Sequence, residues 1–571
     1  MIPTTIRIAQ RRNEEGQVCV LAGVDMDISQ SRREFLGAAT AVATGGLAAA
    51  AYSALCPGSA VSPATRLKAS VQTATLTAAR EADARGGGRV IGGGLTSADW
   101  VALAGDLSGP LVRPGDATYD TDKRLYDPRF DGLCPAGIVY CHGVADVVTC
   151  LAFARKYGMP VAARSGGHSY AGWSSTTGLI VDVTPLNEVV VSGTTAAIGA
   201  GAHLIDVYSQ MDAHGKAIPA GSCPTVGIAG LTLGGGIGVT GRAHGLTCDN
   251  LQQVQIVTAD GTVRYASPQG CPDLFWACQG GGGGNFGIAT QFVFGTWPAQ
   301  DLSYFFLSWP WSRAAEVVAG WQSWAPRAPV ELWSNMHLSA APGGSVPAIQ
   351  VGGTYLGPVS GLPGQLDALY GAVGCYPSSV YTNRASYLDV MLVMAGCAGQ
   401  TVAECRLPAQ GPSGRFPRVP QFAKSDFFTR PLSSDGIATM LHGVESLQSV
   451  RGAAGGAGGI ALDALGGRIN QVKPGATAFV HRDALFDAQY TTNWAIGAGA
   501  AGIASQHAWL RSFWQSMRPY ASGQAYQNYI DPDLTNGGAW KKAYYGANYA
   551  RLAAVKKKYD PGQLFTFPQA V

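Results

Sequence analysis

The sequence predicts an α+β protein built from more than one domain, and three observations support this prediction. The chain has 571 residues, 47% of them apolar and only 13% charged, so it can bury a large core and extends over about two to four domain-sized units. From about residue 131, short β-rich runs alternate with amphipathic stretches of helical period. Glycine accounts for 77 residues, and many of them cluster directly after the predicted strands.

The N-terminal segment carries a pattern typical of an export signal. Arg32 and Arg33 stand before a weakly hydrophobic run rich in Ala, Gly and Thr, which resembles a bacterial twin-arginine signal. A chance arginine pair before an ordinary helix is the alternative interpretation. We expect residues 1–55 to be this signal and residues 56–104 to be a linker or helical segment. The twin-arginine translocase would then be a partner during export, and the mature protein would be secreted or periplasmic.

Charge, hydropathy and cysteine usage argue against several classes of function. The formal net charge is +3 and the longest basic run is Lys556–Lys558, so no nucleic-acid partner is expected. Beyond the export signal no stretch has about eighteen uninterrupted apolar residues, which argues against stable membrane insertion. The nine histidines lack metal-ligand spacing, so no metal site is predicted. Twelve cysteines permit disulfides in an exported protein, and Cys397 with Cys405 is one local candidate pair.

The region from residue 137 to residue 215 is predicted as strands alternating with helices. The apolar residues of the stretch 144–157 lie on one helical face, and Gly158 is a stop signal directly after them. The predicted strands are 137–141, 159–164 and 178–183, and the predicted helices are 144–157 and 202–215.

Three glycine-rich loops predict a phosphate-bearing ligand. They are residues 165–169, 221–238 and 278–288. Glycine lets backbone N–H groups approach an anion closely, because no Cβ intervenes and positive φ angles are accessible. Three such loops within about 130 residues indicate one extended ligand, and a dinucleotide fits best. No GxGxxG opens the first helix of a βαβ unit, so the pattern differs from the Rossmann fingerprint.

The stretch between about residues 300 and 500 has the pattern of antiparallel strands rich in aromatic residues, followed by helices. Five tryptophans here could stack on a sugar or a planar ring system, although packing in the core is the main alternative for most of them. They are Trp309, Trp311, Trp321, Trp324 and Trp333.

Five motifs together resemble one known family. They are "RSGGHSY" (164–170), "GSCPTVGIAGLTLGGGIG" (221–238), "GLTCDNLQQVQIVTADG" (245–261), "DLFWACQGGGGGNFGI" (273–288) and the ending "YYGANYARLAAVKKKYDPGQLFTFPQ" (544–569). This combination resembles the berberine-bridge-enzyme-like branch of the vanillyl-alcohol oxidase flavoproteins, over essentially everything after residue 105. The resemblance implies that the ligand is FAD.

The resemblance also implies a domain organisation. A PCMH-type FAD-binding domain of two α/β subdomains is expected at residues 105–300. A substrate-binding domain, an antiparallel sheet flanked by helices, is expected at residues 301–520. A C-terminal segment at residues 521–571 is expected to return to the FAD domain.

In the resembling branch the flavin is attached at two points, and the matching residues here are His168 and Cys223. A neutral imidazole and a thiolate are nucleophiles suited to an electron-poor flavin ring. The alternative is that His168 caps a turn and Cys223 is a buried apolar thiol. The other residues that the resemblance places at the cofactor are Arg164, Ser165, Gly166, Gly167, Ser169, Gly221, Ser222, Thr225, Val226, Gly227, Gly230, Gly234, Gly235, Gly236, Gly238, Ile256, Tyr545 and Asn548.

The segment "GQAYQNYIDPDL" (523–534) resembles the family's YxN segment, which implies that Tyr526 is the catalytic base. A free tyrosine has a pKa of about 10, so neighbouring donors or cations must stabilise the phenolate. Tyr170 and Gln489 match family active-site positions and are the expected supports. Asp463 is a further catalytic candidate that could instead be structural.

Two positions bear on the substrate and on the electron acceptor. Relatives that act on sugars often have GGGYG where this chain has "GGGIG", so Ile237 replaces a tyrosine and puts a carbohydrate substrate in doubt. The family residue three positions after the flavin cysteine controls the approach of oxygen, and valine admits it. Here that residue is Val226, which implies an oxidase that makes hydrogen peroxide.

The sequence therefore predicts an FAD-dependent oxidase that takes hydride from a CH–OH group of a sugar-like alcohol or a secondary-metabolite glycoside and passes the electrons to oxygen. One alternative is an oxidase of the same family that forms C–N or C–C bonds or oxidises an amine or alkaloid. The other is a flavin-binding protein without catalytic activity.

Overall fold

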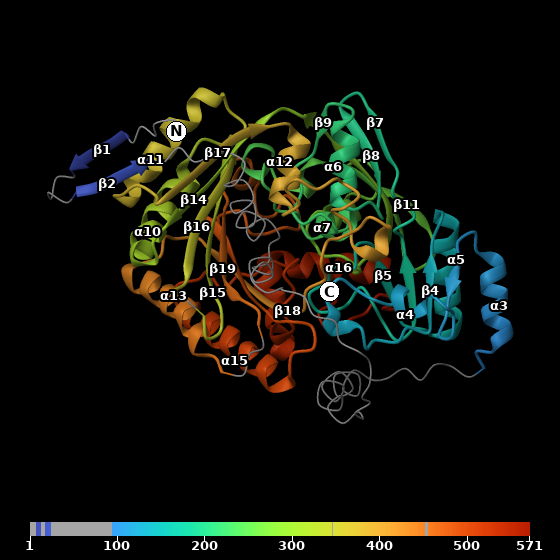
Figure 1. Cartoon of the computed structure of the whole chain (residues 1–571). Coiled ribbons are helices and arrows are strands. Elements are labelled where there is room, and N and C mark those ends of the chain that lie inside the picture. The colour runs from blue at the N-terminus through green and yellow to red at the C-terminus, as the bar shows by residue number, and fades with distance from the viewer. Residues whose placement is uncertain (1–6, 13–17, 24–93, 345, 452–454) are drawn as a thin grey trace.

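The computed structural model describes residues 7–12, 18–23, 94–344, 346–451 and 455–571, and the arginine pair of the predicted export signal lies outside these residues. Two lobes lie side by side in Figure 1, one drawn mainly in blue to green and the other mainly in yellow to orange. The first lobe contains most of residues 94–300, and the second lobe contains most of residues 301–520. Near the N-terminus, β1 (Arg7–Arg12) and β2 (Val18–Gly23) pair as an antiparallel hairpin.

The first sheet of the first lobe is mostly parallel, with the order β3-β4-β6-β5. Helix α5 (Val144–Tyr157) follows β4 and ends at Gly158, whose φ of 60° is the left-handed conformation that favours glycine. These strands and this helix confirm the predicted elements. The bounds are β3 (Leu111–Val112), β4 (Gly137–Tyr140), β5 (Val161–Arg164) and β6 (Leu179–Asp182), with α3 (Ser97–Asp106) and α4 (Tyr119–Asp122) earlier in the chain.

The second sheet of the first lobe is antiparallel, with the order β11-β10-β12-β8-β7. Val254 and Phe292 on its central strands are fully buried in a core that also contains Val181 of the first sheet. The strands are β7 (Val189–Ser192), β8 (Thr195–Gly199), β10 (Leu251–Val257), β11 (Val263–Ala266) and β12 (Ile288–Gly295), with the short pair β9 (Lys216–Ala217) and β13 (Trp297–Pro298). The helices are α6 (Leu204–Asp212), at a predicted position, α7 (Ile228–Leu233), α8 (Gly241–His244) and α9 (Pro272–Cys278).

The second lobe is one antiparallel sheet of seven strands, with the order β17-β14-β16-β15-β19-β20-β18. Helices cover its outer face in Figure 1. Leu338 and Leu462 point into the core under these helices, whereas Asn335 and Asp463 point to the opposite face, because side chains alternate along a strand. The strands are β14 (Leu302–Trp309), β15 (Leu332–Ala340), β16 (Ala348–Tyr355), β17 (Ser379–Ala385), β18 (Gln421–Phe428), β19 (Gly458–Ala464) and β20 (Phe486–Asn493). The helices are α10 (Ala314–Trp324), α11 (Leu362–Val373), α13 (Ser434–Ser446) and α15 (Ala500–Met517).

The tryptophans of the second lobe divide between the core and the other face. Trp309, Trp321 and Trp324 lie in the core under the helices, and Trp311 packs against it. Only Trp333 of the five lines the cavity described below. The core interpretation therefore holds for most of them.

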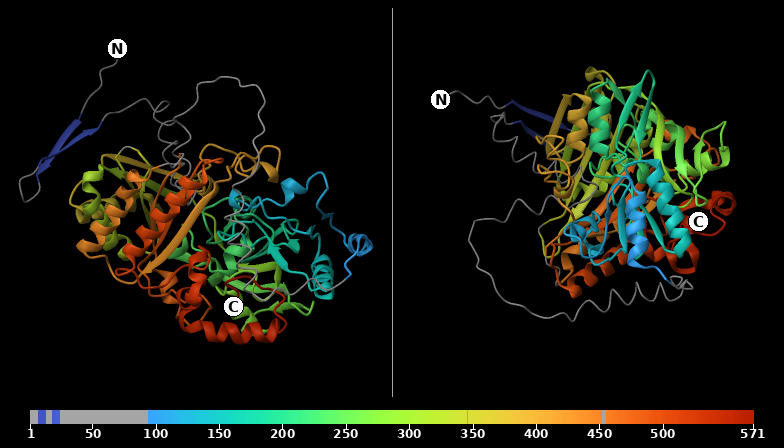
Figure 2. Two further views of the ribbon diagram at one scale, coloured as in Figure 1. Left: turned by 90° about the horizontal axis from the view of Figure 1, so that it is seen from below. Right: turned by 90° about the vertical axis from the view of Figure 1, so that its right-hand side faces the viewer.

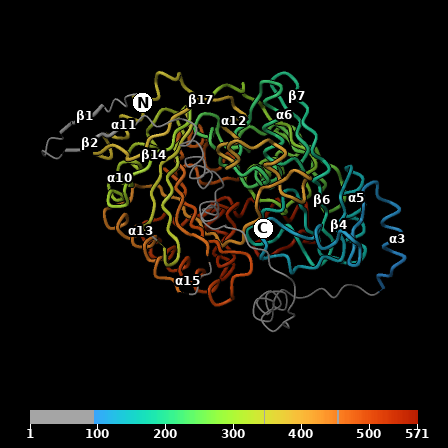
Figure 3. Tube along the Cα trace, in the orientation of Figure 1, coloured from blue at the N-terminus to red at the C-terminus, as the bar shows by residue number. Residues whose placement is uncertain are grey.

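Two later segments return to the first lobe. Helix α12 (Tyr387–Met394) packs against α6, and Figure 3 shows its gold trace beside that helix. A disulfide between Cys397 and Cys405 closes the loop after α12, which confirms the candidate pair. Helix α16 (Tyr549–Tyr559) lies against α9 and is the red helix at the bottom of the left view in Figure 2. Shorter elements include α14 (Arg468–Gln471), a π-helical turn (Lys541–Tyr545) and several 3-10 helices such as Pro128–Phe130 and Pro532–Gly538.

Candidate active site

A cavity of about 360 Å³ lies between the two lobes. The glycine-rich loops of the first lobe form one wall, with residues 165–170, 221–223 and 282–285 among its lining. The inner face of the seven-stranded sheet forms the second wall, and the C-terminal segment 526–530 forms the third. Segments far apart in the sequence therefore meet around one cavity.

The glycine-rich loops approach each other closely because glycine has no side chain. A Cβ on Gly166 would lie 2.2 Å from the backbone nitrogen of Gly227, so no larger residue fits where these loops meet. Gly167, Gly282 and Gly284 have φ angles of 69°, 90° and 73°, which L-residues rarely adopt. Loops of this kind bring backbone N–H groups close to a phosphate-bearing ligand, so this wall fits the predicted dinucleotide.

Twelve of the other predicted cofactor-binding residues line this cavity together with His168 and Cys223. They are Arg164, Ser165, Gly166, Gly167, Ser169, Gly221, Ser222, Val226, Gly227, Gly230, Gly238 and Tyr545. The Arg164 guanidinium is paired with Asp182 and donates from Nη1 to the carbonyl oxygen of Asp122 at 2.7 Å. This arginine is therefore held by the protein itself.

Six predicted cofactor-binding residues lie outside the cavity lining. They are Thr225, Gly234, Gly235, Gly236, Ile256 and Asn548. Ile256 belongs to the core of the first lobe, and Asn548 donates to backbone carbonyl oxygens of residues 474–478. Gly234 makes room for Asn528, because a Cβ there would lie 1.9 Å from Asn528 Oδ1.

His168 and Cys223 face the same cavity from two different loops. The ring of Tyr126 stacks on the imidazole with 4.0 Å between centroids, and His168 Nε2 lies 2.8 Å from the hydroxyl oxygen of Thr225. Burial lowers the pKa of His168 to about 3, so the imidazole is neutral near pH 7. Burial raises the pKa of Cys223 to about 11, so its side chain is a thiol at that pH. The cavity thus presents one ready nucleophile and one that must first lose a proton.

The phenol oxygen of Tyr526 receives two hydrogen bonds. The backbone N–H of Gly236 and the Nδ2 of Asn528 each donate to it at 2.9 Å, and the tyrosine is only 2% exposed. Burial raises the pKa of Tyr526, and the two donors oppose this shift because they stabilise the phenolate. Ile237, next to Gly236, also lines the cavity and contributes no hydroxyl there.

Tyr170 and Gln489 form a separate polar pair in the cavity. Gln489 Nε2 donates to the Tyr170 hydroxyl at 2.8 Å, although the two residues are 319 positions apart in the chain. The sequence-based expectation that they hold the Tyr526 oxygen is corrected, since the donors to that oxygen are the two groups described above. Tyr529 stands edge-on to Tyr170 and Tyr526, with ring centroids 5.8 and 4.9 Å away.

Asp463 also faces the cavity, in the middle of a polar row across the sheet. Its register partner on β15 is Asn335, and its register partner on β20 is Asp487. Burial raises the pKa of Asp463 to about 7. Within the described residues, no group of three or more His, Cys, Asp or Glu side chains is arranged to hold a metal ion.

Sequence reasoning missed several residues of this site, among them Asn335 and Tyr529. Asp487 lies two positions before Gln489, so the period of two along a strand places both on the same face of the sheet. His337 lines the cavity two positions after Asn335 for the same reason. Tyr126 precedes every motif and carries no local signal of its contact with the imidazole.

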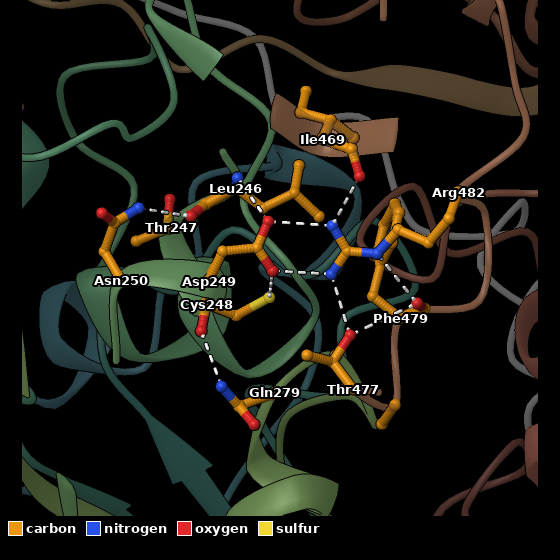
Figure 4. A network of polar contacts seen from close by, with 12 residues as sticks. Leu246, Thr247, Cys248, Asp249, Asn250, Gln279, Ile469, Thr477, Phe479 and Arg482 are labelled. Carbon is orange, nitrogen blue, oxygen red and sulfur yellow. Dashed lines mark hydrogen bonds and ion pairs between the residues drawn. The ribbon is translucent and has the colours of Figure 1, made fainter. Parts of the chain in front are cut away.

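An ion pair behind the cavity joins the first lobe to the loop before β20. Asp249 accepts two hydrogen bonds from Arg482, at 2.8 and 2.6 Å; the Arg482 side chain is fully buried and that of Asp249 is 9% exposed (Figure 4). Arg482 also donates to the hydroxyl of Thr477 at 2.8 Å. Phe479 of the same loop packs edge-on against Tyr526, with 6.0 Å between ring centroids. The ion pair therefore holds the surface against which Tyr526 packs.

A glycine-lined cradle that ends beneath an antiparallel sheet, with a buried phenol at the junction, is the architecture of a flavin-dependent oxidoreductase. Residues 135–267 match the family model described as an FAD binding domain, and residues 525–571 match the model described as berberine and berberine like. The chain belongs to the berberine-bridge-enzyme-like family of FAD-linked oxidoreductases.

Three relatives illustrate the likeness. The uncharacterized FAD-linked oxidoreductase YgaK of Bacillus subtilis is 33% identical, over 81% of this chain and 97% of the relative. The chitooligosaccharide oxidase of Gibberella zeae is 29% identical, over 81% and 92% of the two chains. The structure of Phl p 4, a grass pollen allergen with glucose dehydrogenase activity, is 27% identical with a TM-score of 0.72, over 83% and 99%. An isoleucine-to-valine variant of Phl p 4 is described as a glucose oxidase.

Within the described residues, no helix combines the length and the apolar composition needed to cross a membrane.

Proposed function

We propose that the protein oxidises a CH–OH group of a sugar-like alcohol or secondary-metabolite glycoside, with FAD attached to both His168 and Cys223 and oxygen as the electron acceptor. The observation that carries this proposal is the phenol oxygen of Tyr526, which accepts two hydrogen bonds inside the cavity. An oxygen with two such donors is suited to become a phenolate and to take a proton. Relatives that act on chitooligosaccharides and on glucose support a sugar-like substrate.

In the proposed reaction, Tyr526 acts on the substrate hydroxyl, and the Tyr170–Gln489 pair binds the substrate. A flavin held by His168, Cys223 and the glycine-rich loops would supply the two-electron chemistry, which is acceptance of a hydride from the substrate carbon and transfer of two electrons to oxygen, so that oxygen and two protons give hydrogen peroxide. Tyr526 takes the proton of the substrate hydroxyl, so that a C–H and an O–H bond break and a carbonyl forms. The Tyr170–Gln489 pair faces the same space and binds polar groups of the substrate.

The proposed attachment points are supported by their chemistry and their placement. The His168 ring is neutral, and its Nε2 contacts Thr225, so Nδ1 is the ring nitrogen available to the cofactor. Cys223 lines the same cavity but is protonated near pH 7, so its bond to the flavin requires removal of the thiol proton. We expect the bond to Cys223 to form more slowly than the bond to His168.

The assignment of oxygen as the acceptor depends on Val226. This residue lines the cavity three positions after Cys223, where a small side chain would leave room for oxygen next to a bound flavin. The Phl p 4 relative supports the same idea, because a single isoleucine-to-valine change separates a glucose dehydrogenase from a glucose oxidase in that protein.

Replacing Val226 by leucine should slow reoxidation of the reduced protein by oxygen and leave anaerobic reduction by substrate nearly unchanged. The longer side chain would fill the space that oxygen needs, and it leaves the hydroxyl of Tyr526 and its two donors in place. Stopped-flow measurement of the two half-reactions tests this, with the exposed Val190→Leu as a control for the same substitution elsewhere. An equal loss in both half-reactions would show that Val226 only packs the wall.

The substrate class is tested by bleaching of the flavin absorbance under anaerobic conditions. Purified protein is mixed with sugars, glycosides, phenolic alcohols and alkaloids, and hydrogen peroxide is measured after air is admitted. Bleaching by sugars or glycosides supports the proposal. Bleaching by alkaloids alone would instead favour an oxidase that forms C–N or C–C bonds, and no bleaching would favour a flavin-binding protein without activity.

We also propose that the protein leaves the cytoplasm through the twin-arginine pathway, directed by Arg32 and Arg33. The disulfide between Cys397 and Cys405 supports an oxidising destination. Replacing both arginines by lysine should retain the folded, flavin-containing protein in the cytoplasm of a host that has this pathway. Cell fractionation measures this, and unchanged export of the variant would contradict the proposal.

A further inference from the structure

Two aspartates face each other on the cavity side of the seven-stranded sheet. Asp463 of β19 is the register partner of Asp487 of β20. Directly opposite residues in an antiparallel pair lie on the same face with Cβ atoms about 4.5–5.5 Å apart, so the two carboxyl groups are neighbours. Asp463 lines the cavity, whereas Asp487 lies behind it and is only 1% exposed.

Acceptor atoms around this pair lack donors. Neither carboxyl oxygen of Asp487 has a hydrogen-bond partner in the part of the chain that the structure describes. The Oδ1 of Asn335 has none either, although its side chain is buried and lines the cavity beside Asp463. Buried polar atoms are rarely left in this state, so Asn335 Oδ1, which lines the cavity, is placed to receive a donor from a ligand.

No lysine or arginine side chain of the described residues neutralises the charge of the cavity wall formed by Asp463 and Asn335. Among the described residues, the one lysine or arginine that lines the cavity is Arg164, which is already paired with Asp182. His337 on β15 lines the same cavity, with Nε2 at 2.9 Å from Asn335 Nδ2, and burial lowers its pKa to about 4, so it is neutral near pH 7. The other titratable groups around the pair are tyrosines whose pKa burial raises, so they are neutral too; they are Tyr170, Tyr526 and Tyr529.

Of the two carboxyl groups, Asp487 keeps its proton and Asp463 is the one that ionises. Two adjacent buried carboxyls do not ionise independently, because the first negative charge opposes the second. Asp487 is the more deeply buried and keeps its proton, since burial and the neighbouring Asp463 raise its pKa well above the usual range. The Asp487 O–H can then donate to Asp463, whose carboxylate faces the cavity beside Asn335 Oδ1.

We propose that Asp463 and Asn335 bind a protonated amino group of the substrate, with Asp487 as the positioning residue that holds the Asp463 carboxylate. An ammonium group brings three N–H donors and a positive charge to unpartnered acceptors, whereas a hydroxyl brings one donor and no charge. This inference rests on the proposed function and narrows its substrates to amino sugars and other amino alcohols that are oxidised at carbon–oxygen bonds and keep their nitrogen.

Matched pairs of probes test this charge preference. One pair is 6-amino-6-deoxyglucose and glucose, compared by anaerobic flavin reduction. The other is cyclohexylammonium and cyclohexanol, compared by the change in flavin absorbance on binding at pH 8. The ammonium member of each pair should bind about tenfold to a hundredfold more tightly, the range expected for a charge-assisted hydrogen bond.

Variants separate the roles of the two aspartates. Asp463→Asn should bring the ratio of affinities close to one, and Asp483→Asn, the same change on an exposed residue, should leave it unaltered. Asp487→Asn keeps an N–H donor to Asp463 and should preserve the tighter binding of the ammonium probes. Asp487→Ala removes that donor and should reduce the preference at pH 7.

The pH dependence of the ratio of affinities can be measured on the natural protein, so this test does not require any variant to fold. A carboxyl group is charged above its pKa, and burial raises that of Asp463 to about 7. The preference for cyclohexylammonium in the natural protein should therefore rise between about pH 6 and 8. Equal binding of the charged and neutral probes, or a preference that Asp463→Asn leaves intact, would overturn the inference.

Failure of the proposed function would be distinguishable from failure of this inference. If no sugar reduces the flavin but cyclohexylammonium still binds in a manner that depends on Asp463, the proposed oxidation is contradicted and the amine site stands.

Discussion

Replacing Tyr526 by phenylalanine should slow anaerobic reduction of the flavin by about 10² to 10⁴-fold, the usual contribution of a general base. The change removes one hydroxyl and preserves the aromatic packing against Phe479 and Tyr529. The donors from Gly236 and Asn528 lose their acceptor, but the change leaves the glycine-rich loops proposed to hold the cofactor unaltered. The visible flavin spectrum should therefore stay the same while the rate of reduction falls.

The pH dependence of that rate should identify the base. Tyr526 accepts a proton only as a phenolate, and burial raises its pKa, so the rate should rise with pH and reach its inflection above the ordinary tyrosine value of about 10. The sequence led us to expect support of the phenolate from Tyr170 and Gln489, but the Tyr526 oxygen has other donors, and burial outweighs their effect on its pKa. In Tyr526→Phe the alkaline rise should disappear.

A matched control separates this role from a general effect of losing a hydroxyl. Tyr265→Phe makes the same change on an exposed strand and should leave reduction unchanged. If Tyr526→Phe is reduced within about fivefold of the natural rate, the proton goes elsewhere, since a base contributes far more. Asp463 would then be the next residue to replace.

The largest change in cofactor binding is expected from removing His168 and Cys223 together. Each single alanine variant should retain flavin after denaturation through the remaining bond, whereas the double variant should release all of it. The single variant that retains only Cys223 should acquire its flavin bond faster at alkaline pH, because burial raises the pKa of the thiol to about 11. Absorbance of the acid-precipitated protein measures both effects. Release of all flavin from either single variant would show that only one bond exists.

Local patterns predicted much of the first lobe because its signals lie close together in the chain. The strand before His168 and the helix that stops at Gly158 follow directly from hydrophobic period and glycine placement. The glycine-rich loops were likewise visible, because only glycine permits the backbone approach seen between Gly166 and Gly227.

The partners of Tyr526 could not be predicted in the same way. Gly236 contributes a backbone N–H from 290 positions away, and a backbone group has no residue-specific signal in the sequence. The Tyr170–Gln489 bond joins residues 319 positions apart, so only the resemblance placed both in one site, and it did not show that they bond to each other.

The pairing of Asp463 with Asp487 could not be predicted for a different reason, which is that it depends on strand register. Asp463 and Asp487 become neighbours only through the register of β19 against β20, and a shift by one residue would turn Asp487 to the other face of the sheet. The sequence predicted antiparallel strands in this region but not their register. Asp463 was therefore found as a single candidate, and its partner was missed.

The most direct test of the proposed chemistry is the covalent state of the cofactor in the natural protein. Purified protein is precipitated with acid, digested with a protease, and analysed by mass spectrometry for peptides that carry flavin. We predict one yellow species in which a single flavin joins the peptide containing His168 to the peptide containing Cys223. A colourless precipitate with all FAD in the supernatant would contradict the proposal that these two residues hold the flavin beside Tyr526.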